Sequence, residues 1–347
     1  MKTYKDLFIK IVSFDNLLQA AHRAAKGKRE RACVLIFFYK LEDNLYRLRE
    51  QLLSGTYKPG EYDTFYIYQP KTRMISAAPF RNRVVHHALI KIVGPLLERG
   101  FIFDSYANQK GKGTHKAIFR YQDFLQKYRY VLKCDIKKYF PSIDHDILKN
   151  LVRKRIACPP TLGLIDTIID GSNPQEKVYH YFLGDTLFTP TERPRGLPIG
   201  NLTSQVFANY YLDPLDHFVK ETLRCRAYVR YVDDFVLLAD SKSQLWEWKR
   251  EIARFLQSHR LKLHPRRCQV YPAKAVNRFL GQVVFRTHRR LPSENVRRFA
   301  KRLKRWREHP PGNLQQRLAA WTGHARQANT KGLLKSLGLG KFPKGRG

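Results

Sequence analysis

The feature that most constrains the fold is residues 228–239, where two adjacent aspartates interrupt a run of strand-forming residues. Val, Tyr and Phe favour a pleated strand, whereas Asp favours a turn. The segment therefore predicts a strand, a tight turn and a second strand, with Asp233 and Asp234 at the tip. Adjacent carboxylates resist ionising together unless a cation lies between them. The tip is thus either a divalent-metal site or a solvated hairpin end, and this segment alone leaves both open.

A second strand also ends in a carboxylate. Residues 130–134 form an apolar run that leads into Asp135 and then into a turn. Alone, Asp135 could cap a helix or form part of the turn. Beside a strand that ends at Asp233 and Asp234, it completes a cluster of three carboxylates, the ligands that Mg²⁺ prefers.

The charge of the chain predicts a polyanionic partner. Lys and Arg number 65 against 29 Asp and Glu, a formal net charge of +36. Such an excess favours nucleic acid, because neutralising phosphates supplies affinity without reading sequence. An anionic membrane is the less favoured rival, because no basic amphipathic helix opens the chain and the longest apolar run, Val34 to Tyr39, cannot span a bilayer.

Localisation is predicted from two further features. Lys10 interrupts the only apolar segment near the N-terminus, so we expect no signal peptide. The five cysteines are scattered without metal-ligand spacing, which predicts a reducing cytoplasm and no structural zinc.

Two basic segments are candidates for nucleic-acid contact. Residues 106–116 are rich in glycine and lysine and precede a helix, but they lack the spacing of a P-loop. Residues 292–307 combine an apolar stripe with basic faces that we expect to follow a phosphate backbone. The predicted nucleic-acid-binding residues are Lys110, Lys112, Arg297, Arg298, Lys301, Arg302, Lys304 and Arg305.

Two segments are candidates for nucleotide contact. Residues 62–78 alternate as a hairpin with Lys71 and Arg73 at or beside its bend, either a triphosphate clamp or an exposed tip. Residues 195–205 form a turn rich in glycine and proline before a helix, which lets a ligand approach the backbone. The adjacent His86 and His87 are poor metal ligands as a pair, and we assign them to packing or RNA contact.

The order of these segments resembles a reverse transcriptase across about residues 30–330. The strand ending in Asp135 resembles polymerase motif A, residues 195–205 resemble motif B, and residues 231–234 resemble motif C. The resemblance implies an α+β right-hand polymerase with fingers, a helical thumb, and a palm whose antiparallel sheet has helices packed on one face.

The same resemblance predicts the domain boundaries. Residues 1–128 would form N-terminal helices and fingers, and residues 129–286 the palm, with 144–195 partly a fingers insertion. Residues 287–347 would form a basic helical thumb and a loose C-terminal tail.

Finer features of motif B narrow the resemblance. Retroviral and group II intron enzymes usually carry Gln after the proline, whereas this chain has Ile199 and Gly200, with Ser204 and Gln205 following. That pattern is similar to reverse transcriptases of diversity-generating retroelements, as are residues 110–115 and 321–325. The likeness implies a bacterial or phage-encoded enzyme that is error-prone opposite template adenine. Its implied partners are template RNA, a cDNA or primer strand, dNTPs and a small basic accessory protein that assembles as a ring.

Two alternatives remain open at this point. One is a faithful reverse transcriptase of the group II intron or retron type. The other is a non-enzymatic RNA-binding scaffold on a polymerase fold, against which the three intact aspartates count.

The resemblance also assigns roles in catalysis. A primer 3′-hydroxyl would attack the α-phosphate of a dNTP with the help of two Mg²⁺ ions, and Phe140 would act as a steric gate against the 2′-hydroxyl. At motif D, where a Lys is usual, Arg267 is nearest the expected position. Because Arg stays protonated, Lys262 or water would have to supply the proton. The implied metal-site residues are Asp135, Ile136, Asp233 and Asp234, and the implied nucleotide-binding residues are Lys71, Arg73, Phe140, Ile199, Gly200 and Gln205.

Overall fold

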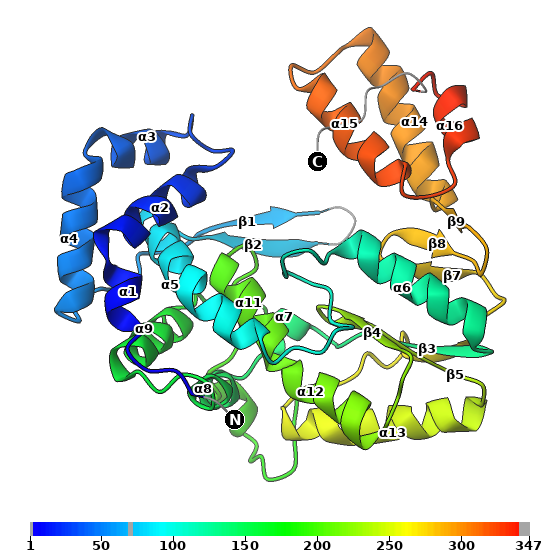
Figure 1. Cartoon of the computed structure of the whole chain (residues 1–347), viewed down its shortest axis with the longest axis horizontal. Helices are drawn as coiled ribbons and strands as arrows, with labels where there is room; N and C mark the ends of the chain where they lie inside the picture. Colours follow the sequence, from blue (N-terminus) through cyan, green and yellow to red (C-terminus); the bar gives the residue numbers. More distant parts are fainter. Residues whose placement is uncertain (1–2, 69–71, 340–347) are drawn as a thin grey trace.

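The computed structural model describes residues 3–68 and 72–339 and shows an α+β fold (Figure 1). Its N-terminal part is helical, as predicted. The N-terminal helices are α1 (Phe8–Val12), α2 (Phe14–Ala25), α3 (Ala32–Tyr39), α4 (Leu41–Leu53) and α5 (Phe80–Glu98). Helices α1, α2 and α3 pack against α5, with α2 making the most extensive contact, and α4 packs against α1, α2 and α3.

The predicted hairpin is formed by β1 (Asp63–Ile67) and β2 (Arg73–Ala77), paired antiparallel with Phe65 opposite Ile75. Every residue of β1 is exposed, so the hairpin projects from the body of the protein. Its base is fixed by a hydrogen bond of 2.9 Å from the Ser76 N–H to the Ile199 carbonyl. The predicted triphosphate residue Lys71 lies outside the described residues.

The central sheet is antiparallel, with strand order β4-β5-β3-β6. Its strands are β3 (Tyr130–Cys134), β4 (Tyr228–Tyr231), β5 (Asp234–Ala239) and β6 (Gln269–Pro272). Two helices cover it from opposite sides: α13 (Lys242–Ser258) and α6 (Thr114–Lys127).

The expectation of helices on one face only was wrong. Leu132 and Leu237 belong to the core that includes α13, whereas Val131 and Val236 pack with the buried residues of α6. Strands β3 and β5 carry apolar side chains on both faces of the sheet, so helices must pack on both faces to bury them.

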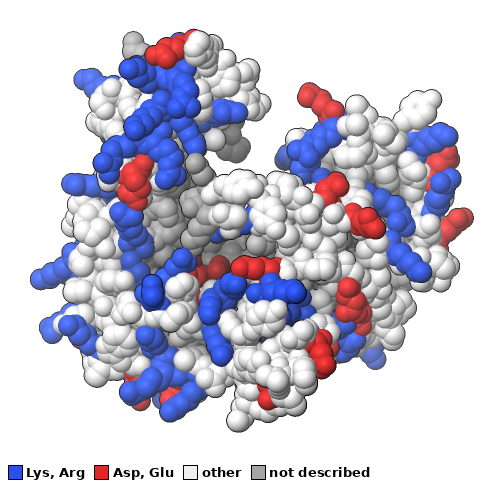
Figure 2. Space-filling model, turned by 180° about the vertical axis from the view of Figure 1, so that it is seen from behind, with Lys and Arg blue, Asp and Glu red and all other residues white. Residues whose placement is uncertain are grey.

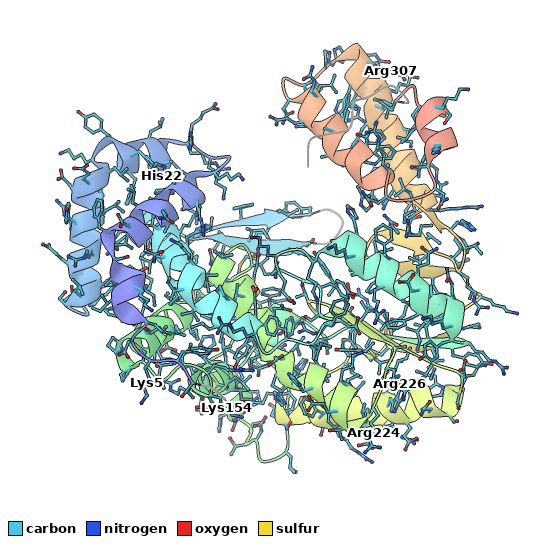
Figure 3. The ribbon with its side chains drawn as sticks, in the orientation of Figure 1. Lys5, His22, Lys154, Arg224, Arg226 and Arg307 are labelled. Atoms are coloured by element: carbon cyan, nitrogen blue, oxygen red, sulfur yellow. The ribbon has the colours of Figure 1, made fainter. Side chains whose placement is uncertain are left out.

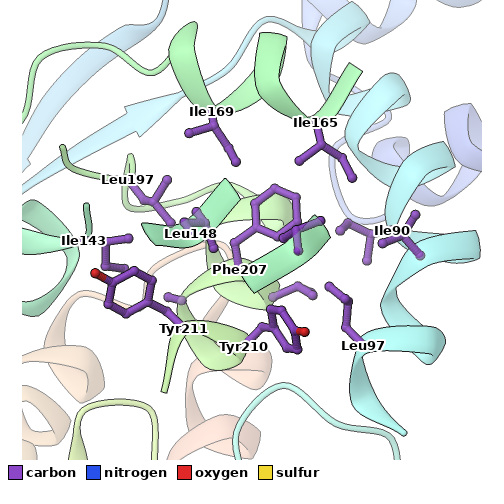
Figure 4. Packing of buried hydrophobic residues seen from close by; sticks show 14 of the residues in the cluster. Ile90, Leu97, Ile143, Leu148, Ile165, Ile169, Leu197, Phe207, Tyr210 and Tyr211 are labelled. Carbon is purple, nitrogen blue, oxygen red and sulfur yellow. The ribbon is translucent and has the colours of Figure 1, made fainter. Parts of the chain in front are cut away.

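The largest core lies beside this sheet and joins it to the N-terminal helices. Figure 4 shows Phe207 surrounded by aliphatic side chains such as Ile165, Ile169 and Leu148. The elements that complete this part of the chain are α7 (Tyr139–Ser142), α8 (His145–Arg153), α9 (Pro159–Asp170), α10 (Thr189–Glu192), α11 (Leu202–Tyr211), α12 (Asp213–His217) and the π-helix η1 (Phe218–Thr222).

The C-terminal part has a small core of its own, in which the Phe299 and Trp321 rings stack with centroids 3.6 Å apart. It comprises β7 (Asn277–Phe279), β8 (Gln282–Val284), β9 (Arg289–Arg290), α14 (Ser293–Glu308), α15 (Leu314–Ala325) and α16 (Lys331–Ser336). The C-terminal tail was predicted to be loose, whereas residues Lys331–Ser336 form α16. Leu334 and Leu339 are buried in the C-terminal core and hold α16 in place.

Figure 1 shows the C-terminal helices standing opposite the N-terminal helices, with the β1–β2 hairpin between them. Across residues 3–68 and 72–339, no helix has the length and apolar character needed to cross a membrane.

Candidate active site

The two adjacent aspartates lie where the sequence predicts, at a hairpin of the central sheet. Tyr231 pairs with Asp234, so Val232 and Asp233 form a two-residue turn. Val232 has a φ of +58°, a left-handed conformation that is rare for a β-branched residue. This turn needs support from its surroundings, since its backbone conformation is unfavourable for valine.

The support comes from Arg230, which is fully buried. Its Nη1 donates to the Val232 carbonyl at 3.2 Å and to Asn209 Oδ1 at 2.7 Å. Its Nε and Nη2 donate to the two oxygens of Asp216, at 2.7 and 2.5 Å. The turn that carries Asp233 is therefore tied to α11 through Asn209 and to α12 through Asp216.

Asp135 joins this hairpin from the neighbouring strand. Cys134 pairs with Phe235, so Asp135 leaves β3 beside the point where Asp234 begins β5. Asp135, Asp233 and Asp234 line one polar cavity of about 250 Å³. The structure therefore brings the predicted carboxylate trio together.

Four cations line the same cavity and offset the charge of the carboxylates: Arg73, Lys133, Arg267 and Arg278. Among them, Arg267 donates through Nη1 to Asp135 Oδ2 at 2.6 Å. The main chain brings it there, because the His264 N–H donates to the Asp135 carbonyl at 2.7 Å. Lys262 does not line this cavity; its ammonium lies 5.2 Å from the Phe182 ring centroid. Of the two motif D residues, Arg267 is the one that reaches the carboxylates.

Lys133 is a cavity residue that sequence reasoning missed. Burial, together with repulsion from the Arg278 guanidinium, lowers the pKa of Lys133 to about 8, while the Asp234 carboxylate opposes the change. Its Nζ donates to the Arg278 carbonyl at 2.9 Å. The sequence feature that could have identified Lys133 is its position two residues before Asp135 in an otherwise apolar strand.

The other predicted nucleotide-binding residues are distributed differently. Gly200 and Gln205 line a separate cavity, and Phe140 and Ile199 line neither. The Phe140 carbonyl accepts the Leu197 N–H at 3.0 Å, which links the segment after Asp135 to the turn before α11. Gly200 has a φ of +123°, and a Cβ there would lie 3.3 Å from the Ser76 carbonyl oxygen. The positive φ therefore favours glycine at this position, and any side chain here would crowd the base of the hairpin.

The predicted nucleic-acid-binding cations are mostly exposed. Lys110 and the six predicted cations of α14 are all exposed. Lys112 is instead used inside the protein, where its ammonium contacts the Phe103 and Ser105 carbonyls and lies 4.4 Å from the Phe103 ring centroid.

Basic side chains gather over the C-terminal helices, as Figure 2 shows. The same view shows acidic side chains at the floor of the hollow between these helices and the N-terminal part of the chain. Figure 3 places Arg307 among the side chains of the C-terminal helices.

The donor set of the Asp cavity suits Mg²⁺, because carboxylates are hard oxygen ligands. Within residues 3–68 and 72–339, however, no three His, Cys, Asp or Glu side chains stand close enough together to hold a metal as they are. Arg267 engages Asp135 Oδ2, so a metal bound through that oxygen would require the pair to open. Arg267 is about half exposed and has room to withdraw. Ile136 is buried, so only its main-chain carbonyl could serve as a ligand.

Comparison with known proteins places this site in a family. Residues 58–284, which contain all three aspartates, match the reverse transcriptase (RNA-dependent DNA polymerase) family. Protein YkfC of Escherichia coli (strain K12) is 26% identical over 310 residues, covering 75% of this chain and 78% of that protein.

Intron proteins are also similar to this chain. Group II intron-encoded protein LtrA of Lactococcus lactis subsp. cremoris is 25% identical over 181 residues, covering 51% of this chain and 28% of LtrA. Nuclear intron maturase 1, mitochondrial, of Arabidopsis thaliana is 28% identical over 94 residues, covering 27% of this chain and 13% of that protein. The chain belongs to the reverse transcriptase family and is an RNA-directed DNA polymerase.

Proposed function

We propose that the cavity of Asp135, Asp233 and Asp234 is where this enzyme joins a dNTP to the 3′ end of a DNA strand copied from RNA. The observation that carries the proposal is the meeting of three carboxylates and four cations in one polar cavity. When bound, two Mg²⁺ ions would activate the primer 3′-hydroxyl and stabilise the leaving pyrophosphate. The ligands would be Asp135, Asp233 and the Ile136 carbonyl, with Asp234 as a weaker ligand.

The chain's own cations suit the substrate. Arg73 enters the cavity from the projecting hairpin, and Arg278 and Lys133 enter from the sheet side. Their positive charges would hold the triphosphate against the carboxylates, which is positioning and charge compensation rather than covalent chemistry. The division into N-terminal helices and fingers (1–128), palm (129–286, with 144–195 partly a fingers insertion) and thumb with its tail (287–347) is retained as part of this proposal.

The experiment is primer extension on an RNA template with the full chain, across a Mg²⁺ titration. Asp233→Asn removes one ligand charge without changing the shape of the turn, and extension should fall at least about 100-fold. Glu247→Gln on α13 removes one exposed carboxylate that does not line the cavity and should leave extension unchanged. Full activity in Asp233→Asn would contradict the assignment.

Two proposals for fidelity have separate support. Ile199 at the turn before α11 supports error-prone copying opposite template adenine, in the manner of a diversity-generating retroelement with its ring-forming accessory protein. Similarity to group II intron-encoded proteins supports a faithful enzyme of that type instead. The error spectrum of the unsubstituted protein opposite template adenine separates the two. Because Ile199 offers no hydrogen bond to an incoming nucleotide, substitution of this residue tests whether it is the cause of such errors.

A further inference from the structure

A second cavity, of about 370 Å³, lies against the base of the β1–β2 hairpin. Its walls come from α2, the segment leading into α3, the hairpin, the start of α5 and the turn before α11. It shares no lining residue with the Asp cavity. The lining residues that matter here are Lys28, Arg31, Ser76, Arg83, His86 and Asn201.

The inner part of this cavity holds four buried polar atoms without a hydrogen-bond partner: Ser76 Oγ, Arg83 Nη1, His86 Nδ1 and Asn201 Nδ2. Ser76, His86 and Asn201 are at most 3% exposed. Burial, with the neighbouring His87 and Arg83, lowers the pKa of His86 to about 3, so its imidazole is neutral. Buried polar atoms in proteins are nearly always paired with protein, water or ligand, so these four atoms offer hydrogen-bond donors and acceptors to a polar group that enters the cavity.

The outer part of the cavity is cationic. Lys28, Arg31 and Arg83 lie close enough together that burial and the two guanidiniums lower the pKa of Lys28. Across the described ranges, none of these three cations forms an ion pair with a carboxylate. Three clustered positive charges without an acidic partner are suited to an anion.

The two parts together match the chemistry of a nucleotide. We propose that this cavity binds one unpaired nucleotide of a single-stranded RNA. Lys28, Arg31 and Arg83 hold its phosphate, and Ser76, His86 and Asn201 bond its base edge. Phe65 and Ile75, which also line the cavity, supply an apolar wall for the base. This inference rests on the proposed function, because it requires an RNA template strand that runs beside the β1–β2 hairpin.

The first test measures binding without catalysis. Full-length protein in EDTA is titrated against an RNA–DNA duplex that is blunt or carries a five-nucleotide RNA overhang, and fluorescence anisotropy reports affinity. The double variant Lys28→Gln, Arg31→Gln should weaken binding of the overhang duplex about tenfold and of the blunt duplex less than twofold. The matched control Lys26→Gln, Arg29→Gln removes two exposed cations from the same loop that do not line the cavity, and both duplexes should bind it as they bind the parent protein.

Equal weakening of both duplexes, or equal effects of the two double variants, would overturn the proposal. Adenosine 5′-monophosphate serves as a competitor to separate a strand nucleotide from a free one. It should displace the overhang only at millimolar concentration, and displacement at micromolar concentration would instead assign the site to a free nucleotide. These affinities are measured without catalysis. They would be unchanged if the Asp cavity were not the site of primer extension, so failure of the proposed function can be distinguished from failure of this inference.

The second test addresses the inner part of the cavity. Ser76→Ala removes only an unpaired hydroxyl, so the melting temperature of the free protein should stay the same or rise. Affinity for the overhang duplex should nevertheless fall about threefold, because the bound nucleotide loses a hydrogen bond. A variant that binds the overhang as tightly as the parent would contradict a role for this residue in binding.

Discussion

Ile199 is the residue that we propose to govern the fidelity of the enzyme. Its carbonyl is bonded to the hairpin through Ser76, so the position of its backbone is fixed while its side chain offers no hydrogen bond. Ile199→Gln adds a contact of about 0.5–1.5 kcal/mol and should lower misincorporation opposite template adenine several-fold. Sequencing of cDNA made by both proteins measures this, with Ile199→Val as the apolar control. Identical error spectra would reject this role for Ile199, and a low error rate of the unsubstituted protein opposite template adenine would favour the faithful group II intron type.

Phe140 is the residue assigned to sugar selection. Its ring is half-buried and lies edge-on to Tyr139, with centroids 5.7 Å apart. Phe140→Ala removes the bulk that would clash with a 2′-hydroxyl, so incorporation of ribonucleotides relative to deoxyribonucleotides should rise at least about tenfold. The ratio of kcat/KM for the two substrates is the measurement, and Phe140→Tyr should retain discrimination. An unchanged ratio in the alanine variant would remove Phe140 from this role.

The three aspartates were predictable at the residue scale because each stands out against an apolar strand. Arg230 and Lys133 were not, although both also interrupt such strands. A single Lys or Arg in a strand is ordinarily interpreted as an exposed residue. The partners of Arg230 are Asp216 and Asn209, which lie on helices outside its own strand. Only the fold shows that these residues meet.

At the scale of elements, the β4–β5 hairpin is held in position by the buried Arg230 of β4, which bonds to α11 and α12. Arg230→Lys keeps a positive charge beside Asp216 but loses the fork of donors that also reaches Asn209 and Val232. We expect the protein to fold with a lower melting temperature, and kcat for primer extension to fall about tenfold with KM for dNTP little changed.

The matched control for that variant is Arg153→Lys, which alters a surface pair with Asp166. A surface pair of this kind contributes little, so stability and kcat should be nearly unchanged. If Arg230→Lys keeps full kcat once the folded fraction is taken into account, the buried network stabilises the fold without positioning the turn.

The central sheet illustrates the limit of prediction at this scale. Strands β3, β4 and β5 were predicted from their residues, whereas the antiparallel sheet was implied only by the resemblance. The helix on the second face was not predicted to lie there, because α6 precedes β3 in sequence and its contact with β4 and β5 is long-range.

At the scale of the whole molecule, the basic residues that give the net charge of +36 lie in separate groups on the surface. The exposed cations of α14 lie on the C-terminal helices, whereas Figure 3 places Lys154, Arg224 and Arg226 at the opposite side of the protein. Charge alone predicted a nucleic-acid partner, but the separation of these two groups could be seen only in the fold.

Neutralising one group at a time tests this separation. The triple variant Arg297→Gln, Arg298→Gln, Lys301→Gln should weaken binding to a primer–template duplex. It should also lower the slope of log K against log salt by about 0.7–0.9 for each phosphate that the protein no longer neutralises. Fluorescence anisotropy between about 50 and 200 mM salt measures both quantities.

The matched control for the triple variant is Lys154→Gln, Arg224→Gln, Arg226→Gln. It removes the same charge from the opposite side of the protein and should change neither the affinity nor the slope. Equal slopes for the two variants would mean that α14 has no special role in binding the duplex.

The most direct measurement of the central claim is a crystal structure with an RNA–DNA primer–template, a non-hydrolysable dNTP and Mn²⁺, located by its anomalous scattering. The account predicts metal bound by Asp135 and Asp233, the triphosphate beside Arg73, and the ion pair between Arg267 and Asp135 opened. Metal and triphosphate bound elsewhere, with the Arg267–Asp135 pair intact, would contradict it.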